Sequence, residues 1–506
     1  MKFAVINGKM IPESLLPNQQ PSYPISSIEE IPHLPTNMQY SPNSSLRSQL
    51  IGKQLLLDEI SSPIEEIHEH YLNGYISYRK GITVEKNIPF CHRCGNHDPS
   101  WFASFHCFRC DETCTYCRKC LMMGRVSTCT PLCSWKETDH NTPTSHVPSA
   151  LLSWSGTLSE GQQTASDQVV QTISNNKELL VWAVCGAGKT EVLFAGIDYA
   201  LAHQKRVCIA TPRTDVVLEL TPRLQKVFPS IEVASLFGGS VDRHKHAPLT
   251  ISTTHQLLRF YRAFDAVILD EVDAFPYSVD ETLQFAVKNA RKDVSSMIYL
   301  TATPNAKWQK ECRLHKREFV TIPARYHRYP LPVPKFVWCG NWQKLLKKDK
   351  LPLNVTKWLQ QRLEANKPAF LFIPRIALFS KILPLVKKLD PKIEGVHAED
   401  PKRKEKVQAM RNHEIPLLVT TTILERGVTF PNLDVAVLGA EDHIFTESAL
   451  VQISGRVGRS AQYPDGDITF FHYGKTEAMV RAQNQILSMN KEAAGRGLLG
   501  EEGSDE

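Results

Sequence analysis

Residues 181–190 read VWAVCGAGKT and decide the class of fold to which this chain belongs. An apolar strand breaks here into a glycine-rich turn. Glycines let the backbone fold so that successive N–H groups point at phosphate oxygens. In such a loop the lysine reaches the β- and γ-phosphates, and the hydroxyl that follows it holds Mg²⁺. The stretch therefore predicts a nucleoside triphosphate site formed by Gly186, Ala187, Gly188, Lys189 and Thr190.

The residues that follow the loop predict an amphipathic helix. Its positive N-terminal end would point at the nucleotide, as expected of a phosphate-binding loop. The apolar positions that share one face of this helix are Leu193, Phe194, Ile197, Ala200 and Leu201.

Composition sets broad limits on the kind of protein. The 506 residues are 42% hydrophobic and 22% charged, as is usual for a soluble globular protein. The net charge of +6 permits a polyanionic partner without requiring one. The sequence has no apolar run of the ~20 residues that span a bilayer, and its start does not resemble a secretory signal. We expect a cytoplasmic protein and leave peripheral attachment at the inner face of the cell membrane open.

Alternating apolar strands and helical stretches predict parallel sheets covered on both faces. The strands expected from the pattern are 179–184, 206–210, 266–269, 297–301, 369–373, 417–420, 435–438 and 468–471. The expected organisation is a partly disordered Pro/Ser/Asn-rich extension (1–88), a cysteine-rich module (89–140), a first α/β domain (141–323), a second α/β domain (324–490) and an acidic tail (491–506), with a polar linker at 136–149.

A second set of candidate residues follows the apolar run AVILD, which ends in Asp270 and Glu271. Carboxylates at the end of a strand suit the second half of an ATPase site. Asp270 would hold Mg²⁺ through a water, and Glu271 would polarise the attacking water. The alternative is an acidic surface turn.

The segment LSEGQ, residues 158–162, allows two interpretations. Ser159 and Gln162 have the spacing of a capping box at the start of a helix. The amide of Gln162, or of Gln163, could instead recognise the edge of adenine. The residues alone leave both interpretations open.

A third set of candidates lies in QISGRVGR, residues 452–459. The spacing predicts that Arg456 and Arg459 share one face of a helical turn. Guanidinium groups stabilise the charge that develops on a transferring phosphoryl group. As an isolated pattern, the segment could be a basic surface patch.

Taken together, the motifs resemble those of superfamily 2 helicases and translocases, in the same order. They are LSEGQ, AVCGAGKT, ATPR, STTH, DEVD, TATP, LFIPR, TTTILERGVTF and QISGRVGR. The chain is most similar to the ComFA family of late competence proteins, through DEVDAFP, IPARYHRYPLPVP, VHAED and the cysteine-rich segment. DEVD in place of DEAD, and Gln452 where RNA-unwinding relatives carry histidine, argue against an RNA helicase.

The resemblance implies two RecA-like lobes with ATP and Mg²⁺ between them. Gln452 would then contact the nucleotide, and Arg456 and Arg459 would reach it from the second lobe. Gly427 and Thr429 would help to couple DNA to ATP. The residues expected to contact the backbone of single-stranded DNA are Arg213, Thr254, Arg375, His397 and Thr420.

The cysteine-rich segment holds nine of the thirteen cysteines between residues 91 and 133. In a reducing compartment such a cluster favours metal over disulfides. The resemblance favours a Zn²⁺ site of Cys91, Cys94, Cys117 and Cys120. A second ion could be held by Cys107 and Cys110 with two of Cys114, Cys129 and Cys133. An iron–sulfur cluster or metal-free thiols stay open as alternatives.

The function implied by the resemblance is ATP-driven translocation of single-stranded DNA during uptake of transforming DNA. The implied partners are competence proteins at the inner membrane face, including the uptake channel and ComFC-like and DprA-like proteins; self-association is left open. The alternatives are a replication-restart or repair helicase and a zinc-dependent DNA-binding scaffold with a nucleotide switch.

Overall fold

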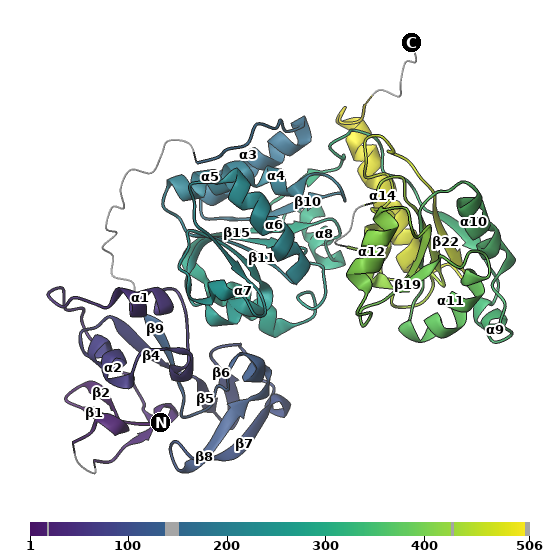
Figure 1. The fold of residues 1–506 in the computed structure, drawn as a ribbon. Helices are drawn as coiled ribbons and strands as arrows, with labels where there is room; N and C mark the ends of the chain where they lie inside the picture. Colours follow the sequence, from purple (N-terminus) through teal and green to yellow (C-terminus); the bar gives the residue numbers. More distant parts are fainter. Residues whose placement is uncertain (18–19, 137–150, 427–429, 501–506) are drawn as a thin grey trace. The chain divides into compact units, whose positions relative to one another are not determined.

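The computed structural model describes residues 1–17, 20–136, 151–426 and 430–500 (Figure 1). The chain forms two compact units, each assembled from three segments. Unit 1 comprises 1–155, 169–178 and 194–299, and unit 2 comprises 156–168, 179–193 and 300–506. The sequence-based boundaries at 141, 324 and 491 remain predictions, because the units are defined by other segments. The predicted linker falls, from residue 137 on, outside the described residues.

A seven-stranded sheet has the strand order β12-β13-β11-β14-β15-β10-β16. Strands β11, β12, β13 and β14 pair in parallel with one another, and β10 pairs in parallel with β16. The bounds are β10 Glu178–Ala183, β11 Val207–Thr211, β12 Val233–Leu236, β13 Leu249–Thr253, β14 Phe264–Asp270, β15 Arg291–Thr301 and β16 Phe319–Ile322.

The helices associated with this sheet include the one expected after the glycine-rich loop. That helix is interrupted at Leu193, but its predicted apolar face is buried as expected. The bounds are α3 Glu160–Ser174, α4 Lys189–Val192, α5 Phe194–Ala202, α6 Thr214–Val227, α7 Glu281–Ala290 and α8 Ala306–Arg313.

A six-stranded sheet in unit 2 has the order β17-β22-β21-β18-β20-β19, and all its pairs are parallel. Its strands are β17 Lys335–Trp338, β18 Ala369–Phe372, β19 Glu394–Val396, β20 Leu417–Thr420, β21 Asp434–Leu438 and β22 Ile468–His472. Its helices are α9 Trp342–Leu346, α10 Leu353–Glu364, α11 Phe379–Lys387, α12 Arg403–Arg411, α13 Glu447–Ser454 and α14 Glu477–Gly495.

Both faces of this second sheet are buried. Phe370 and Phe372 of β18 join a core with residues of α12, α13 and α14, whereas Ala369 and Leu371 join another with residues of α9, α10 and α11. Alternate residues of a strand point to opposite faces, so helices cover both sides, as is typical of parallel sheets. All eight strands predicted from the sequence are present.

The first 88 residues differ from the prediction of a poorly ordered start. The described part forms β1 (Lys2–Ile6), β2 (Lys9–Pro12), β3 (Tyr23–Pro24), α1 (Ser44–Leu50) and α2 (Ile64–Leu72). These elements share one core with β4 (Ile76–Lys80) and β9 (Pro131–Trp135). The prediction rested on the many prolines and serines of this segment. It did not take account of dispersed apolar residues such as Phe3 and Met10, which are fully buried and complete that core.

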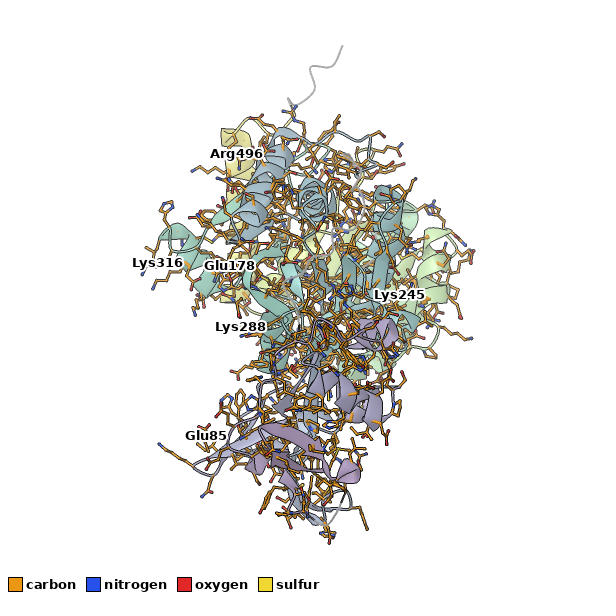
Figure 2. The ribbon with its side chains drawn as sticks, turned by 90° about the vertical axis from the view of Figure 1, so that its left-hand side faces the viewer. Glu85, Glu178, Lys245, Lys288, Lys316 and Arg496 are labelled. Atoms are coloured by element: carbon orange, nitrogen blue, oxygen red, sulfur yellow. The ribbon has the colours of Figure 1, made fainter. Side chains whose placement is uncertain are left out.

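The C-terminal segment is also less solvated than the predicted acidic tail. Helix α14 continues to Gly495, and Arg496 (Figure 2) donates to the carbonyl oxygen of Thr321 at 3.3 Å. Leu498 is 7% exposed and packs beside Gly161. Residues 501–506 lie outside the described part. Among the described residues, no helix combines the length and apolar character needed to cross a membrane.

A partly buried carboxylate connects the start of unit 1 to the rest of that unit. Glu59 accepts from Arg93, at 3.1 and 3.2 Å, and from the Nε of Arg259 at 3.3 Å. The Arg93 side chain is fully buried, and its Nε also donates to the carbonyl oxygen of Leu258 at 3.4 Å. One carboxylate therefore compensates two guanidinium groups that come from distant parts of the sequence.

Substituting Glu59→Gln removes this compensation while preserving side-chain size. We expect unit 1 to lose about 2–4 kcal/mol of unfolding free energy, because a buried cation is left without its partner. Scanning calorimetry should show a lower transition midpoint. The control is Glu65→Gln, at an exposed position of α2. Equal midpoints for the two variants would contradict the assignment.

Candidate functional site

The glycine-rich loop follows β10 directly, as the sequence predicts. Gly186 and Gly188 have φ angles of 84° and 70°, in the left-handed region that favours glycine. Gly188 is the N-cap of α4, so Lys189 and Thr190 open that helix. The loop thus has the backbone shape of a phosphate cradle, with the predicted lysine and threonine at its end.

Gln162 braces this loop from the start of α3. Its Oε1 accepts from the backbone N–H of Ser159 at 2.8 Å, while Ser159 Oγ accepts from the N–H of Gln162 at 3.4 Å. Its Nε2 donates to the carbonyl oxygen of Ala187 at 2.8 Å. The capping arrangement is therefore present, and the same amide also holds the phosphate loop.

The segment that contains Gln452 lies against the loop within unit 2. The Cys185 thiol donates to Gln452 Oε1 at 3.2 Å. A Cβ on Gly455 would lie 2.4 Å from the Cβ of Cys185 and 2.6 Å from its Sγ. The close approach of the two segments therefore depends on a residue without a side chain.

The helical turn predicted for the two arginines is present only at Arg456, whose N–H donates to the carbonyl oxygen of Ile453 at 3.0 Å, and Arg459 lies beyond it. Helix α13 ends at Ser454, and Gly458, with φ of 67°, turns the chain away. Arg456 is 3% exposed, and its Nε and Nη2 donate to the carbonyl oxygen of Glu425 at 2.8 and 2.6 Å. Arg459 Nε donates to the carbonyl oxygen of Gly455 at 2.8 Å.

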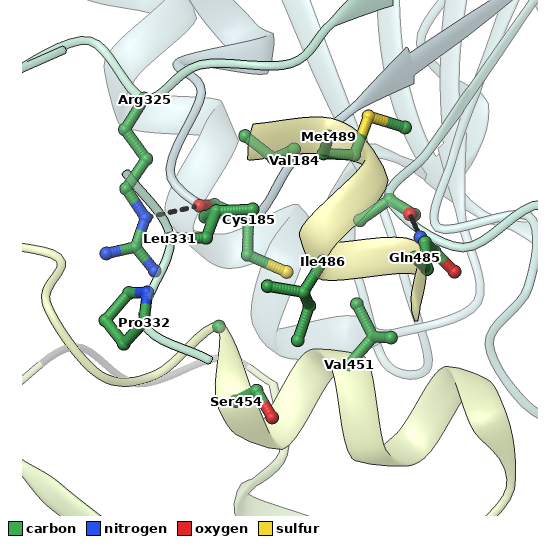
Figure 3. Close-up of a pocket in the computed structure, with 12 residues that line it drawn as sticks. Val184, Cys185, Arg325, Leu331, Pro332, Val451, Ser454, Gln485, Ile486 and Met489 are labelled. Atoms are coloured by element: carbon green, nitrogen blue, oxygen red, sulfur yellow. Dashed lines mark hydrogen bonds between the residues drawn. The ribbon is translucent and has the colours of Figure 1, made fainter. Parts of the chain in front are cut away.

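Arg325 is a site residue that the sequence analysis missed. Its Nε donates to the carbonyl oxygen of Cys185 at 3.2 Å (Figure 3). Its Nη1 donates to the carbonyl oxygen of Gly458. The residue is 1% exposed, and burial lowers the pKa of its guanidinium to about 10. Its Nη2 is buried and has no hydrogen-bond partner among the described residues. The only sequence signal was its place in the segment IPARYHRYPLPVP.

Two cavities border this arrangement in unit 2. One of about 20 Å³ lies among Val184, Cys185, Val451 and Ser454 (Figure 3), which is space for one water. A larger one, about 140 Å³, is lined by Ser159, Glu160, Gly161, Ile322, Ala324, Arg325, Arg328 and Leu498. The larger cavity therefore brings together the start of α3, the missed arginine and the C-terminal segment.

Asp270 and Glu271 belong to unit 1. Asp270 is the last residue of β14, and its Oδ1 accepts from the N–H of Glu271 at 2.8 Å. Glu271 has a φ of 55°, which is uncommon for a residue other than glycine and is a form of backbone strain that clusters at functional sites. The acids therefore occupy the predicted strand end.

The residues predicted to contact DNA fall into two groups. Arg375 is exposed and pairs with Asp442 at 3.0 Å, and Arg213 pairs with Asp215 at 2.6 Å. The His397 Nδ1 is buried and has no hydrogen-bond partner. These three side chains offer cationic or polar groups of the kind that bind phosphate.

The two threonines differ from the expectation. Thr254 and Thr420 are fully buried, and the Thr420 hydroxyl donates to the carbonyl oxygen of Val396 at 3.0 Å. Neither hydroxyl is on the surface, because each residue lies where a buried strand ends. Gly427 and Thr429 lie outside the described residues.

Four cysteines come together as the sequence analysis favoured. The sulfurs of Cys91, Cys94, Cys117 and Cys120 lie within 4.8 Å of one another and are buried. The separations are 3.7 Å for Cys91–Cys120 and 3.6 Å for Cys94–Cys117. A tetrahedral Zn²⁺ with Zn–S bonds of ~2.3 Å places its sulfurs roughly 3.8 Å apart, so this donor set fits zinc.

Cys133 is excluded from such a role. It lies in the apolar core of the N-terminal elements, and burial raises the pKa of its thiol. A neutral buried thiol is what this environment favours.

Comparison with known proteins agrees with the motifs. Three family models match the chain: the Competence protein ComFA N-terminal domain at 38–134, the Type III restriction enzyme res subunit at 155–306, and the Helicase conserved C-terminal domain at 354–461. The two parallel-sheet α/β domains and these matches define a superfamily 2 helicase.

The particular family follows from its relatives. Competence protein ComFA of Bacillus subtilis is 49% identical over 462 residues, covering 91% of this chain and 98% of that protein. Competence protein ComFA of Streptococcus pneumoniae is 39% identical over 416 residues, covering 81% and 93%. This chain belongs to the ComFA family of competence proteins.

A solved structure of RecG bound to a three-way DNA junction is similar to the chain at a lower level. It is 18% identical with a TM-score of 0.48, and the match covers 68% of this chain and 47% of that one.

Substituting Gly455→Ala should separate the loop from the segment that covers it. The added Cβ cannot lie 2.4 Å from that of Cys185, so the loop or the segment must shift. We expect ATP turnover to fall on the order of 10²-fold, because displacements of about 1 Å in a site have effects of that size. Gly474→Ala, where a Cβ meets nothing within 4 Å, is the control for a steady-state ATPase assay. Equal turnover in both variants would refute the importance of this contact.

Proposed function

We propose that this chain is an ATP-driven translocase of single-stranded DNA that powers the uptake of transforming DNA. The observation that carries the proposal is the packing of the 452–458 segment on the glycine-rich loop, through Cys185 and Gly455. In a helicase, a contact of this kind makes the geometry of the phosphate site depend on the position of the helices and strands of the six-stranded sheet. Membership of the ComFA family supports the role in competence.

The residues of the loop would bind the triphosphate and its metal. The backbone of Gly186, Ala187 and Gly188 offers N–H groups to phosphate oxygens, and Lys189 adds a positive charge. Thr190 would bind Mg²⁺ through its hydroxyl, and Asp270 would hold the ion through a water; oxygen donors of this kind are the ones that Mg²⁺ prefers. When bound, that ion neutralises charge on the phosphates.

The remaining residues would serve hydrolysis. Glu271 is the carboxylate that orients and deprotonates the attacking water. Arg456 and Arg459 would stabilise the charge on the transferring phosphoryl group.

Arg325 would position the segment that covers the loop, because it donates to the carbonyl oxygens of both Cys185 and Gly458. Gln162 holds the loop, and the cavity beside it would receive the adenine.

The DNA would be held by its backbone. Arg213, Arg375 and His397 are the side chains that we assign to phosphate contacts, which make binding tolerant of sequence and sensitive to salt. We place the protein in the cytoplasm, at the inner face of the membrane, with the DNA uptake channel and ComFC-like and DprA-like proteins as partners.

Lys189→Ala tests the site. We expect DNA-stimulated ATP hydrolysis to fall at least about 10²-fold, since a preorganised charge on the phosphates is lost. The measurement compares ATPase rates with single-stranded DNA, double-stranded DNA, RNA and no nucleic acid. The exposed Lys316→Ala is the control, and an unchanged circular dichroism spectrum shows that the fold persists. An ATPase rate that does not rise when single-stranded DNA is added would contradict the translocase proposal.

Arg375→Ala tests the DNA contact. We expect oligo(dT) and oligo(dA) to lose affinity equally, with the slope of log K against log salt smaller by about 0.7, because one phosphate contact is removed. Fluorescence anisotropy at several salt concentrations measures both effects. Lys350→Ala, an exposed basic residue outside the motif, should leave the slope unchanged. A loss confined to one base composition would argue against a backbone contact.

A further inference from the structure

A second group of four thiols lies beyond the cluster described above. The sulfurs of Cys107, Cys110, Cys114 and Cys129 are within 4.8 Å of one another. Cys107–Cys129 are 3.6 Å apart and Cys110–Cys114 are 3.3 Å apart. The four residues are at most 3% exposed. The separations are close to the roughly 3.8 Å that a tetrahedral zinc site requires.

The backbone at this group repeats that of the first cluster. In the first, the N–H of Gly95 donates to the carbonyl oxygen of Cys91 at 2.8 Å, and Gly95 has a φ of 72°. In the second, the N–H of Asp111 donates to that of Cys107 at 2.8 Å, and Asp111 has a φ of 52°. Both are Cys-x₂-Cys turns closed by a left-handed residue, so the same local fold presents a pair of thiols twice.

The hairpin that surrounds this second group has few other buried residues to stabilise it. Strands β7 (Phe102–Cys107) and β8 (Glu112–Cys117) form a separate two-stranded sheet, and their only buried residues are cysteines. Among the described residues, the cluster around the second group contains the four thiols and the partly buried Phe105. An isolated hairpin is marginally stable in water, so this one needs a further source of stability.

We propose that Cys107, Cys110, Cys114 and Cys129 bind a second structural zinc ion. Four thiolates with no exposed position form a closed site, which suits a structural ion. Cys129 comes from the chain just before β9, so the ion would join the hairpin to the rest of the module. The free energy of metal binding would then be folding free energy for the hairpin.

The order of the ligands interlocks the two sites. Along the chain, two cysteines of the first group are followed by three of the second, two of the first and one of the second. Strand β8 supplies Cys114 to one group and Cys117 to the other. Residues three apart on a strand point to opposite faces, so β8 lies between the two ions.

The test is metal content of the purified full-length chain, with zinc and iron both measured by plasma mass spectrometry. We expect about two zinc ions per chain, one for each thiol group. Cys110→Ser should lower the content to about one, whereas Cys133→Ser, a buried cysteine outside both groups, should leave it at about two.

The wild-type value decides the matter even if the Cys110→Ser chain fails to fold. About one zinc per chain, iron in place of zinc, or a Cys110–Cys114 disulfide seen by mass spectrometry under non-reducing conditions would each overturn the proposal. Hydrogen exchange gives an independent readout: in Cys110→Ser, β7 and β8 should exchange faster than in the Cys133→Ser control.

Discussion

The contact between Cys185 and Gly455 is the constraint on which the candidate site depends. Two segments from distant parts of the sequence can approach this closely only because one of them has no side chain at the point of contact. The surrounding hydrogen bonds, from the Cys185 thiol to Gln452 and from Arg325 to both segments, all presuppose that approach. Tight packing of this kind has discrete arrangements rather than a continuous range, so the loop and its cover should shift together.

The same logic governs the N-terminal part of the chain. There the apolar core is accompanied by sets of polar groups that depend on one another. The carboxylate of Glu59 binds two guanidinium groups, and each proposed ion would bind four thiols. Removing one member of such a set leaves the others buried and unpaired, which is more costly than losing one apolar contact. Small modules with few apolar residues depend on such sets for their stability.

The sequence predicted what local pattern controls. Long apolar runs located eight strands, and the glycine-rich loop with its lysine was recognisable from ten residues. Strands such as β12 and β19 were missed because they are short and carry weak signals. The shared helical turn predicted for Arg456 and Arg459 forms only in part, because Gly458 adopts a φ of 67° between the two residues. Arg325 could not be predicted, since its partners lie 140 and 133 residues away.

Unit 2 is assembled from three separate stretches, and this has a consequence for biosynthesis. The loop residue Cys185 bonds to Arg325, 140 residues later, and to Gln452, 267 residues later. At about 5–20 residues per second, a ribosome needs roughly 15–50 s to cover the longer interval. During that time the loop has emerged without the segment that covers it, so this part of the fold is completed only near the end of translation.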